Sequence, residues 1–296
     1  DQPRSRGLGD VYKRQHIHYD LIMNVQEYIN RHLFEDLNCD NLSHVACMSM
    51  YHFRRVFKDV VGENVGDYIQ RLRLEYIAFK LISTNTRVSE LLEQINFQNK
   101  HTLSRAFKKH FQMSIPAFRK AYSNVAYENK IIKQLEYSIK RIKEIKVAYL
   151  KFERTHRNKQ AYSTLWKQIM EFAKKYNLTD KGFKYVSISL DSLDITEIDK
   201  CRFLIGITVP YSMEIPKGFS VLNIQTGLYS VFNIKGRYHE LNKIYRDIYL
   251  DWLPNSKYRL REQMTFEIYT NTPDKASMEE LVTEIYLPIE VKQKIK

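Results

Sequence analysis

The sequence predicts a chain of two parts: an all-α domain of tandem helix-turn-helix units, followed by an α+β domain of two β-α-β-β repeats. Three observations lead to this multidomain fold class. In the first half, a block of helical hydrophobic periodicity returns after 50 residues. In the second half, a series of strand and helix patterns returns after about 80 residues. The length of 296 residues also allows about two ordinary domains, each with its own core.

Composition and charge exclude several classes of protein. No apolar run approaches the ~18 residues of a membrane-spanning helix, so we expect no integral membrane protein. The three cysteines contain no C-x-x-C pair, which excludes a disulfide scaffold and a cysteine zinc site and favours a cytoplasmic location. The net charge of +13 fits a nucleic-acid partner, an anionic membrane surface or a solvated lysine-rich exterior.

Enzyme signatures are mostly missing. The sequence contains no G-x-x-x-x-G-K-[ST], no G-x-G-x-x-G, no G-x-S-x-G and no H-E-x-x-H. Its nine histidines are scattered. We therefore predict no catalytic residue, no metal site and no cofactor.

Changes of pattern along the chain predict its segments. Residues 1–15 show neither helical nor strand periodicity and lack a secretory signal, so we expect a non-native or disordered tail. The tandem helix-turn-helix domain is expected over 16–124 and a Lys- and Tyr-rich helical connector over 125–144. The α+β domain is expected over 145–296.

The first half begins with an amphipathic helix whose apolar stripe recurs every four residues at Leu21, Val25, Ile29 and Leu33. A first helix-turn-helix unit is predicted over 37–62, and Ser49 is suited to cap its second helix. A second unit follows over 88–111, and about 67–83 reads as one connecting helix. The repeat is shown by Phe53, Arg55, Phe57 and Lys58, which correspond to Leu103, Arg105, Phe107 and Lys108.

The second helix of each unit carries basic and polar residues on its outward face. They are Tyr51, Arg54, Arg55 and Lys58 in the first unit, and Lys100, His101, Ser104, Arg105 and Lys108 in the second. Outward residues near such a helix N-terminus meet base edges in the major groove, where arginine suits guanine and lysine anchors phosphates. Residues 16–124 hold 14 basic and 11 acidic residues, so the positive charge is concentrated locally. This favours double-stranded DNA over a merely solvated basic face, and the lack of a Trp/Phe-rich insertion face disfavours a membrane surface.

These residues resemble the AraC/XylS family of bacterial transcription regulators. The resemblance rests on LSHVACMSMYHFRRVFK (42–58), RLRLEYIAFKLI (71–82), NFQNKHTLSRAFKKHF (96–111) and SIPAFRK (114–120). It implies a monomer that places both recognition helices in successive major grooves, with RNA polymerase as a further candidate partner and a location at the bacterial nucleoid. Asn96 and Gln112 stand where the family prefers glycine, and the closing proline has moved to Pro116.

The second half alternates strand and helix patterns. VAYLKFER, KYVSISL and RFLIGITV predict strands and TLWKQIMEFAKKY a helix, and the order returns as GLYSVFNI, LNKIYRDIYLDWL, MTFEIYT and TEIYLPI. The repeats predict two halves joined across a cleft. This half resembles the GyrI-like effector-binding domain through DKCRFLIGITV (199–209), GLYSVF (227–232), DWLP (251–254), FEIY (266–269) and TEIYLPI (283–289). A chain with both domains resembles the Rob-type branch of the AraC family.

Glu267 is the candidate for ligand binding. In MTFEIYT, alternation places Thr265, Glu267 and Tyr269 on one face of a strand. From the residues alone, a solvated strand glutamate is the favoured alternative. The resemblance implies instead a pocket glutamate that binds a small, cationic or amphipathic effector, as in a multidrug response. Aromatic residues that could wall such a pocket are Tyr229, Phe232, Trp252 and Tyr269, although such residues are more often plain core, as we expect for Trp166.

Two functions stay open at this point. The first is a ligand-responsive, DNA-binding transcription regulator, either activator or repressor. The alternative is a GyrI-like small-molecule hydrolase or drug-sequestering protein that uses Glu267. A hydrolase would also need a second acid–base partner such as a tyrosine, which the sequence does not identify.

Overall fold

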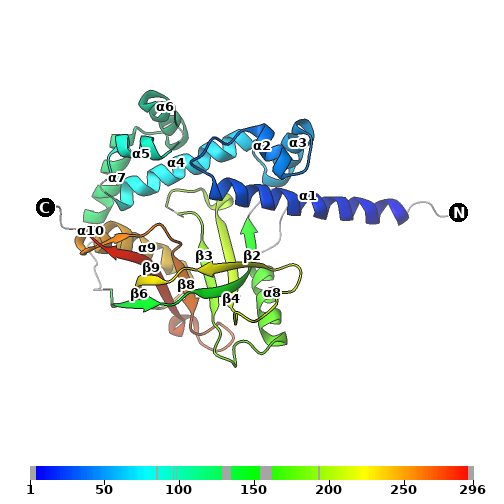
Figure 1. The fold of residues 1–296 in the computed structure, drawn as a ribbon. Coiled ribbons are helices and arrows are strands. Elements are labelled where there is room, and N and C mark those ends of the chain that lie inside the picture. The colour runs from blue at the N-terminus through cyan, green and yellow to red at the C-terminus, as the bar shows by residue number, and fades with distance from the viewer. Residues whose placement is uncertain are drawn as a thin grey trace. The chain divides into compact units, whose positions relative to one another are not determined.

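The computed structural model describes residues 5–84, 86–95, 97, 99–128, 135–153, 162–192 and 194–292. The chain divides into two compact units, the first formed mainly by residues up to Arg119 and the second by residues from Lys120 onward. The first is helical, and the second contains a sheet with helices (Figure 1). Within the described ranges, no helix is long and apolar enough to cross a membrane. No His, Cys, Asp or Glu cluster there is arranged to hold a metal ion.

The described helices of the first unit match the predicted order. They are α1 (Ser5–Arg31), α2 (Cys39–Val45), α3 (Met50–Val61), α4 (Val65–Ser83), α5 (Val88–Gln94), α6 (Lys100–Phe111) and α7 (Ile115–Glu128), whose residues from Lys120 onward belong to the second unit. The two helix-turn-helix units are α2–α3 and α5–α6, and α4 is the connecting helix. The backbone of residues 5–15 differs from the expected tail because it is helical and continuous with α1. A segment without periodicity can extend a helix that is nucleated further along the chain. That residues 1–15 are non-native stays a prediction.

Apolar stripes of these helices form the core of the first unit. Ile22, Val25 and Ile29 of α1 are fully buried in one cluster with Phe53 and Phe57 of α3. The rings of Phe57 and Tyr68 meet edge to face at 5.5 Å. The equivalent pair 50 residues later, Phe107 and Phe118, meets edge to face at 5.3 Å. The internal repeat therefore extends from the sequence to the aromatic packing.

The recognition helices α3 and α6 also share their ends. Both are 12 residues long, and Ser49 caps α3 as predicted, accepting from the His52 backbone N–H at 3.4 Å. Asn99 caps α6 in the same way through Thr102. Each helix ends in the left-handed conformation, at Gly62 with φ 90° and at Gln112 with φ 56°. Gln112 thus occupies a position that favours glycine, while Asn96 lies outside the described residues.

The second unit is built on one antiparallel sheet. Its described strands are β1 (Tyr137–Ile142), β2 (Ile145–Glu153), β3 (Tyr185–Ser189), β4 (Arg202–Thr208), β5 (Ser220–Ile224), β6 (Gly227–Lys235), β7 (Tyr258–Leu260), β8 (Phe266–Tyr269) and β9 (Val282–Val291). They lie in the order β1-β6-β9-β8-β3-β4-β2-β5, with β7 paired to β9. The helices are α8 (Tyr162–Lys175) and a second helical segment made of α9 (Leu241–Asp247), a π-helical turn η3 (Ile248–Trp252) and α10 (Leu253–Asn255).

The expected helical connector over 125–144 is wrong for residues 137–142, which form strand β1 and pair with β6. Five of the six residues of β1 are exposed, so the strand lacks the alternating apolar face by which it could be recognised. The α+β domain therefore begins before Ile145.

The two predicted β-α-β-β repeats are present as β2-α8-β3-β4 and β6-α9-β8-β9. The structure adds one strand before each of them, β1 and β5. These two strands are exchanged: β1 pairs with β6 of the second repeat, and β5 pairs with β2 of the first. The two repeats meet where β3 pairs with β8 at the centre of the sheet.

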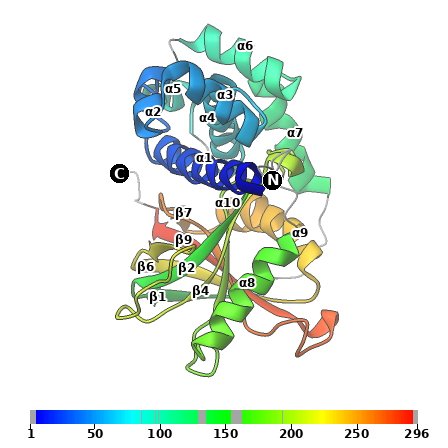
Figure 2. The same ribbon diagram turned by 90° about the vertical axis from the view of Figure 1, so that its right-hand side faces the viewer.

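The helices of both repeats cover the same face of the sheet (Figure 2). One register row crosses this face through Phe232, Ile285, Glu267, Ser187 and Ile205. Ile205 belongs to the core cluster under α8, and Phe232 and Ile285 belong to the cluster under α9. Glu267 and Ser187 therefore lie on the central strands, between the two helix-covered cores.

Candidate functional site

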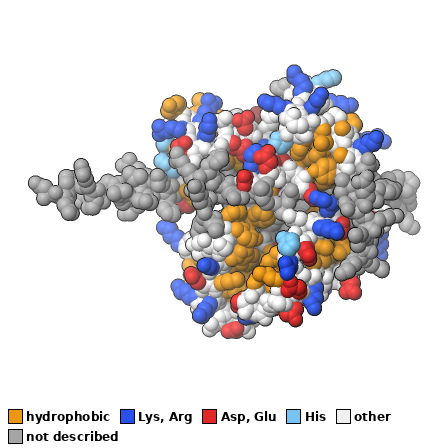
Figure 3. Space-filling view, turned by 180° about the vertical axis from the view of Figure 1, so that it is seen from behind, with side chains coloured by type: hydrophobic (Ala, Val, Ile, Leu, Met, Phe, Trp, Pro, Cys, Tyr) orange, Lys and Arg blue, Asp and Glu red, His pale blue; other side chains and the backbone are white. Residues whose placement is uncertain are grey.

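The side chains predicted to face DNA are all exposed on α3 and α6. Over 12 positions the two helices have the same order of exposed, half-buried and buried residues, except that Val56 is buried and Ala106 is half-buried. Each helix-turn-helix unit thus presents one copy of the same exposed face. Lysine and arginine side chains gather along the upper rim of the helical unit in the view of Figure 3.

Two arginines of α3 contact neighbouring side chains. The Arg54 Nε donates to the Sγ of Cys39 on α2 at 3.2 Å, so α2 orients this side chain. The Arg55 guanidinium lies 3.4 Å from the His52 ring nitrogen Nδ1. By the 50-residue repeat, Arg55 corresponds to Arg105 and Arg54 corresponds to Ser104. The two faces share their overall pattern but differ where Arg54 of α3 corresponds to Ser104 of α6.

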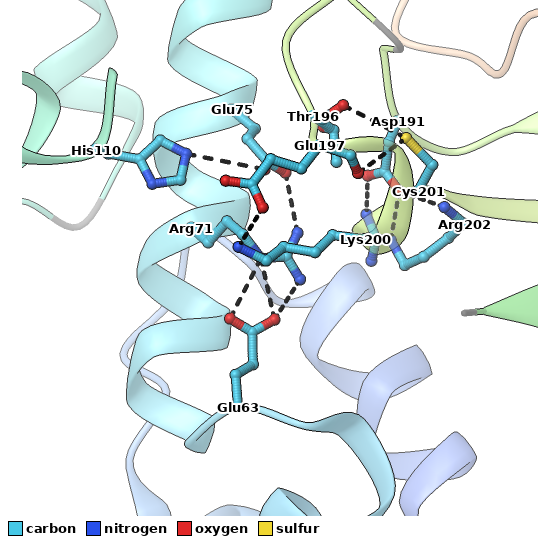
Figure 4. A network of polar contacts seen from close by, with 10 residues as sticks. All are labelled: Glu63, Arg71, Glu75, His110, Asp191, Thr196, Glu197, Lys200, Cys201 and Arg202. Carbon is cyan, nitrogen blue, oxygen red and sulfur yellow. Dashed lines mark hydrogen bonds and ion pairs between the residues drawn. The ribbon is translucent and has the colours of Figure 1, made fainter. Parts of the chain in front are cut away.

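A buried charged cluster on α4 joins three parts of the first unit (Figure 4). The Arg71 side chain is only 5% exposed, and its Nε donates to both oxygens of Glu63, just after α3, at 3.0 and 3.3 Å. Its Nη1 donates to Glu75 at 3.1 Å, and the other Glu75 oxygen lies 3.9 Å from the His110 Nε2 on α6. The cluster therefore connects the segment after the first recognition helix with the second recognition helix.

Burial alone would lower the pKa of the Arg71 guanidinium, but its hydrogen bonds to Glu63 and the charges of Glu75 and Glu63 raise that pKa above its ordinary value. This cluster was not predicted from the sequence. Its signal was the pair of opposite charges at Arg71 and Glu75, four residues apart on one helix.

In the second unit, two tyrosine hydroxyls converge on the Glu267 carboxylate. Tyr245 of α9 donates to Oε1 at 2.9 Å, and Tyr269 of the same strand donates to Oε2 at 2.5 Å. Burial raises the pKa of the Glu267 carboxyl, while the bonds from Tyr269 and Tyr245 oppose that rise. The side chain is nonetheless half-buried rather than sealed. The carboxylate is therefore enclosed by protein and still partly reached by solvent.

Further aromatic residues surround this carboxylate from the side of α8. The Trp166 ring packs edge to face on Tyr269 at 5.3 Å, and Tyr162 is 36% exposed. Burial and then the negative charge of Glu267 raise the pKa of Tyr238 to about 12. Tyrosines with raised pKa values stay protonated at neutral pH, so Glu267 is the acidic group among these side chains. One carboxylate ringed by neutral aromatic faces is chemically suited to an organic cation.

The structure brings together only part of the predicted ligand-binding set. Tyr269 contacts Glu267 as expected. Tyr229 is fully buried on the opposite face of the sheet, where its ring meets Phe266 at 5.6 Å. Phe232 and Trp252 pack against each other at 4.9 Å in the core under α9, two strands from Glu267. The sequence alone did not predict that Tyr162, Tyr238 and Tyr245 belong to this group.

The helical segment that carries Tyr245 contains the π-helical turn. Within that turn, the Tyr249 hydroxyl lies 3.1 Å from the Thr265 hydroxyl, just before β8, and the Tyr249 ring stacks on that of Tyr245 at 6.2 Å. π-Helical turns are rare and occur frequently at functional sites. This one lies on the element that contacts Glu267.

Comparisons with known proteins match both units. Residues 135–290 match the family described as "GyrI-like small molecule binding domain", and residues 42–121 match a helix-turn-helix domain family. The transcriptional regulator Rob of Salmonella typhimurium is 33% identical over 101 residues, which are 34% of this chain and 35% of Rob. The chain thus aligns with about a third of that relative's length.

Two further comparisons each cover part of this chain. The multiple antibiotic resistance protein MarA of Escherichia coli is 28% identical over 116 residues, which are 39% of this chain and 90% of MarA. The crystal structure of the EcmrR C-terminal domain is similar with a TM-score of 0.44 and 16% identity, over 54% of this chain and 99% of that one.

Proposed function

Because the chain belongs to the family of proteins with a GyrI-like small molecule binding domain, here joined to an AraC-type helix-turn-helix domain, we propose that it is a DNA-binding transcription regulator whose C-terminal domain binds an organic effector. The observation that carries the DNA-binding part is the repeated exposed face of α3 and α6. A monomer with two such helices would read two successive major grooves on one side of the duplex. Its place of action would be the bacterial cytoplasm, at the nucleoid, with RNA polymerase as a further partner.

The roles of the exposed residues follow from their chemistry. Arg54, Arg55 and Arg105 would read bases, because a guanidinium bonds guanine with two donors. Lys58 and Lys108 would contact phosphates, which fixes register without reading sequence. The remaining exposed positions, Tyr51, Lys100, His101 and Ser104, would support these contacts.

Selection of binding sites from random duplexes, followed by footprinting, tests this proposal. The wild-type protein should protect about two helical turns as a monomer. Arg105→Ala should lose about 1–3 kcal/mol at particular base pairs, whereas Lys108→Ala should weaken all sequences alike and reduce the salt dependence. Lys174→Ala, at an exposed lysine of α8, is the control with the same loss of charge. Protection of a single groove, or a selected motif unchanged by Arg105→Ala, would contradict the proposal.

The effector part is carried by Glu267 with its two tyrosine donors. An organic cation could take the carboxylate as its charge partner and the rings of Tyr269, Tyr238 and Trp166 as its contact surface. A charge-assisted contact of this kind contributes about 1.5–3 kcal/mol, so Glu267→Gln should weaken cationic ligands by roughly ten- to a hundredfold. Calorimetric titration of quaternary amines and cationic dyes against both proteins is the test. Equal affinities for every cation would remove Glu267 from the site.

We propose a binding role rather than hydrolysis for this site. Tyr245 and Tyr269 each donate to one Glu267 oxygen and hold the carboxylate in place, as a fixed charge partner for a cation requires. The named relatives Rob and MarA are regulators or resistance proteins. Ester turnover that disappears in Glu267→Gln would instead support the hydrolase alternative.

A further inference from the structure

Asp194 joins two helices within the second unit. Its main-chain oxygen accepts a hydrogen bond from the Tyr122 hydroxyl of α7 at 2.6 Å. Its carboxylate pairs with the Arg246 guanidinium of α9. Burial, and then the negative charge of Asp194, raise the pKa of Tyr122, so this hydroxyl stays a donor at neutral pH. Asp194 therefore contacts α7 through its backbone and α9 through its side chain.

The loop that carries Asp194 is fixed at its base. Three residues earlier, Asp191 forms a buried ion pair with Arg202 of β4, with side chains 4% and 6% exposed. Its carboxylate also accepts from the Arg202 backbone N–H at 2.8 Å and from the Nε at 2.9 Å (Figure 4). The chain is therefore held to β4 three residues before Asp194.

The α9 side of this connection reaches the effector site within one residue. Tyr245 donates to Glu267, and the next residue, Arg246, pairs with Asp194. A cation that pairs with Glu267 shares this carboxylate with the Tyr245 hydroxyl, so its binding changes the surroundings of Tyr245. Adjacent residues of one helix move together, so a shift of Tyr245 also changes the position of Arg246.

The α7 side of the connection reaches the recognition-helix core within one helical turn. Phe118, four residues before Tyr122, is 2% exposed and packs on Phe107 of α6 at 5.3 Å. Arg119 donates to the main-chain oxygens of Leu81 and Thr86 at 3.3 and 2.5 Å. α7 is a continuous helix over Ile115–Glu128, so its beginning is held by the helix-turn-helix core while Tyr122 is held by Asp194.

We propose that occupancy of the Glu267 site is transmitted to the DNA-binding domain through α9, Asp194 and α7, with Tyr122 and Arg246 as the positioning residues. This inference rests on the proposed function and adds the physical route of regulation to it. The Arg246–Asp194 pair is partly exposed and contributes little free energy by itself. The connection therefore acts by fixing the position of α9 relative to Asp194. A ligand changes the affinity for DNA only if it binds more tightly to one position of α9 than to another.

Reciprocal linkage supplies the test. The full chain is titrated with its selected duplex in the absence and presence of benzyltributylammonium, or of the quaternary amine from the panel that binds most tightly. The ligand is then titrated with and without the duplex. Both experiments must give the same coupling factor, which lies typically between about 5- and 150-fold for coupled sites.

Tyr122→Phe removes one hydroxyl and keeps the ring. We expect both separate affinities to stay within about twofold of wild type while the coupling factor falls to less than about twofold. Asp194→Ala keeps the main-chain oxygen and removes only the contact with Arg246, and it should reduce the coupling in the same way. Tyr211→Phe is the matched control, because this exposed tyrosine donates to Glu144, away from the route.

The outcomes distinguish the inference from the function on which it rests. Full coupling in both Tyr122→Phe and Asp194→Ala, or wild-type binding of both partners without any coupling, would overturn the proposed route. A wild-type protein that fails to bind a duplex or any cation would overturn the proposed function itself. A loss of coupling in Tyr211→Phe as well would show that the effect is not specific to Tyr122.

Discussion

Replacing Arg71 by methionine should destabilise the helix-turn-helix domain by about 3–5 kcal/mol, the usual cost of removing one partner from a buried ion pair. Methionine keeps much of the aliphatic stem but leaves Glu63 and Glu75, whose side chains are 20% and 8% exposed, without their shared counter-ion. The lost contact of the guanidinium with the Tyr68 ring, at 5.2 Å, adds up to about 1 kcal/mol. Since a domain has only about 5–15 kcal/mol in total, the loss should be large enough to measure directly.

The chain provides its own control for this measurement. Its two tryptophans, Trp166 and Trp252, both lie in the second unit, so tryptophan fluorescence follows that unit. Circular dichroism at about 222 nm follows mainly the helices, most of which lie in the first unit. In urea, Arg71→Met should lower the midpoint of the dichroism transition and leave the fluorescence transition in place.

A variant that also neutralises the two acids separates electrostatics from packing. Adding Glu63→Gln and Glu75→Gln to Arg71→Met removes the two acidic charges with which Arg71 pairs and should recover most of the lost stability. A loss below about 1 kcal/mol for Arg71→Met alone would refute the reasoning that the cluster stabilises the domain. A triple variant no more stable than the single one would mean that lost packing, rather than unpaired charge, is responsible.

Three further predictions follow from the caps and the buried acid. Gln112→Gly should raise the free energy of unfolding by about 0.5–1 kcal/mol in urea, because glycine avoids the left-handed strain at φ 56°; an unchanged or lower midpoint would count against this account. Asn99→Ala should cost about 1 kcal/mol by removing the bond to the Thr102 backbone N–H, and an unchanged dichroism midpoint would disprove a capping role. Burial raises the pKa of Glu267, so the folded state holds this proton more tightly than the unfolded state, and stability should fall as pH rises from the ordinary glutamate range through the raised pKa. Glu267→Gln should remove that slope and be the more stable protein near about pH 7 by fluorescence-monitored unfolding, whereas parallel pH profiles would contradict the raised pKa.

The helical half could be predicted from the sequence because its information is local. The periodic stripes around Val25 and Phe53, the cap at Ser49 and the 50-residue repeat each depend on residues close together in the chain. Arg71 was missed because its significance depends on Glu63 and His110, which come near it only after the helices pack.

The second half was predicted less completely for the same physical reason. Glu267 was found through alternation along its own strand, but Tyr245 and Tyr162 reach it from other elements with no fixed spacing in the sequence. Tyr229 lies two residues from Val231 on the same face of β6, and only the register of the strands reveals that this face is opposite to Glu267. Strand β1 was not predicted because it exposes most of its residues and so lacks an apolar face.

The exchange of β1 and β5 between the two repeats also has a consequence for synthesis on the ribosome. Tyr137 pairs with Phe232, so β1 must wait for about 95 further residues before its partner strand exists. At translation rates of about 5–20 residues per second, this delay lasts roughly 5–20 s. Throughout it, β1 is an unpaired edge, and Lys140 and Arg141 near its end are the charges that keep such an edge from pairing with other chains. The exposed, polar character of β1, which prevented its prediction from hydrophobic patterning, thus also protects the nascent chain until β6 is made.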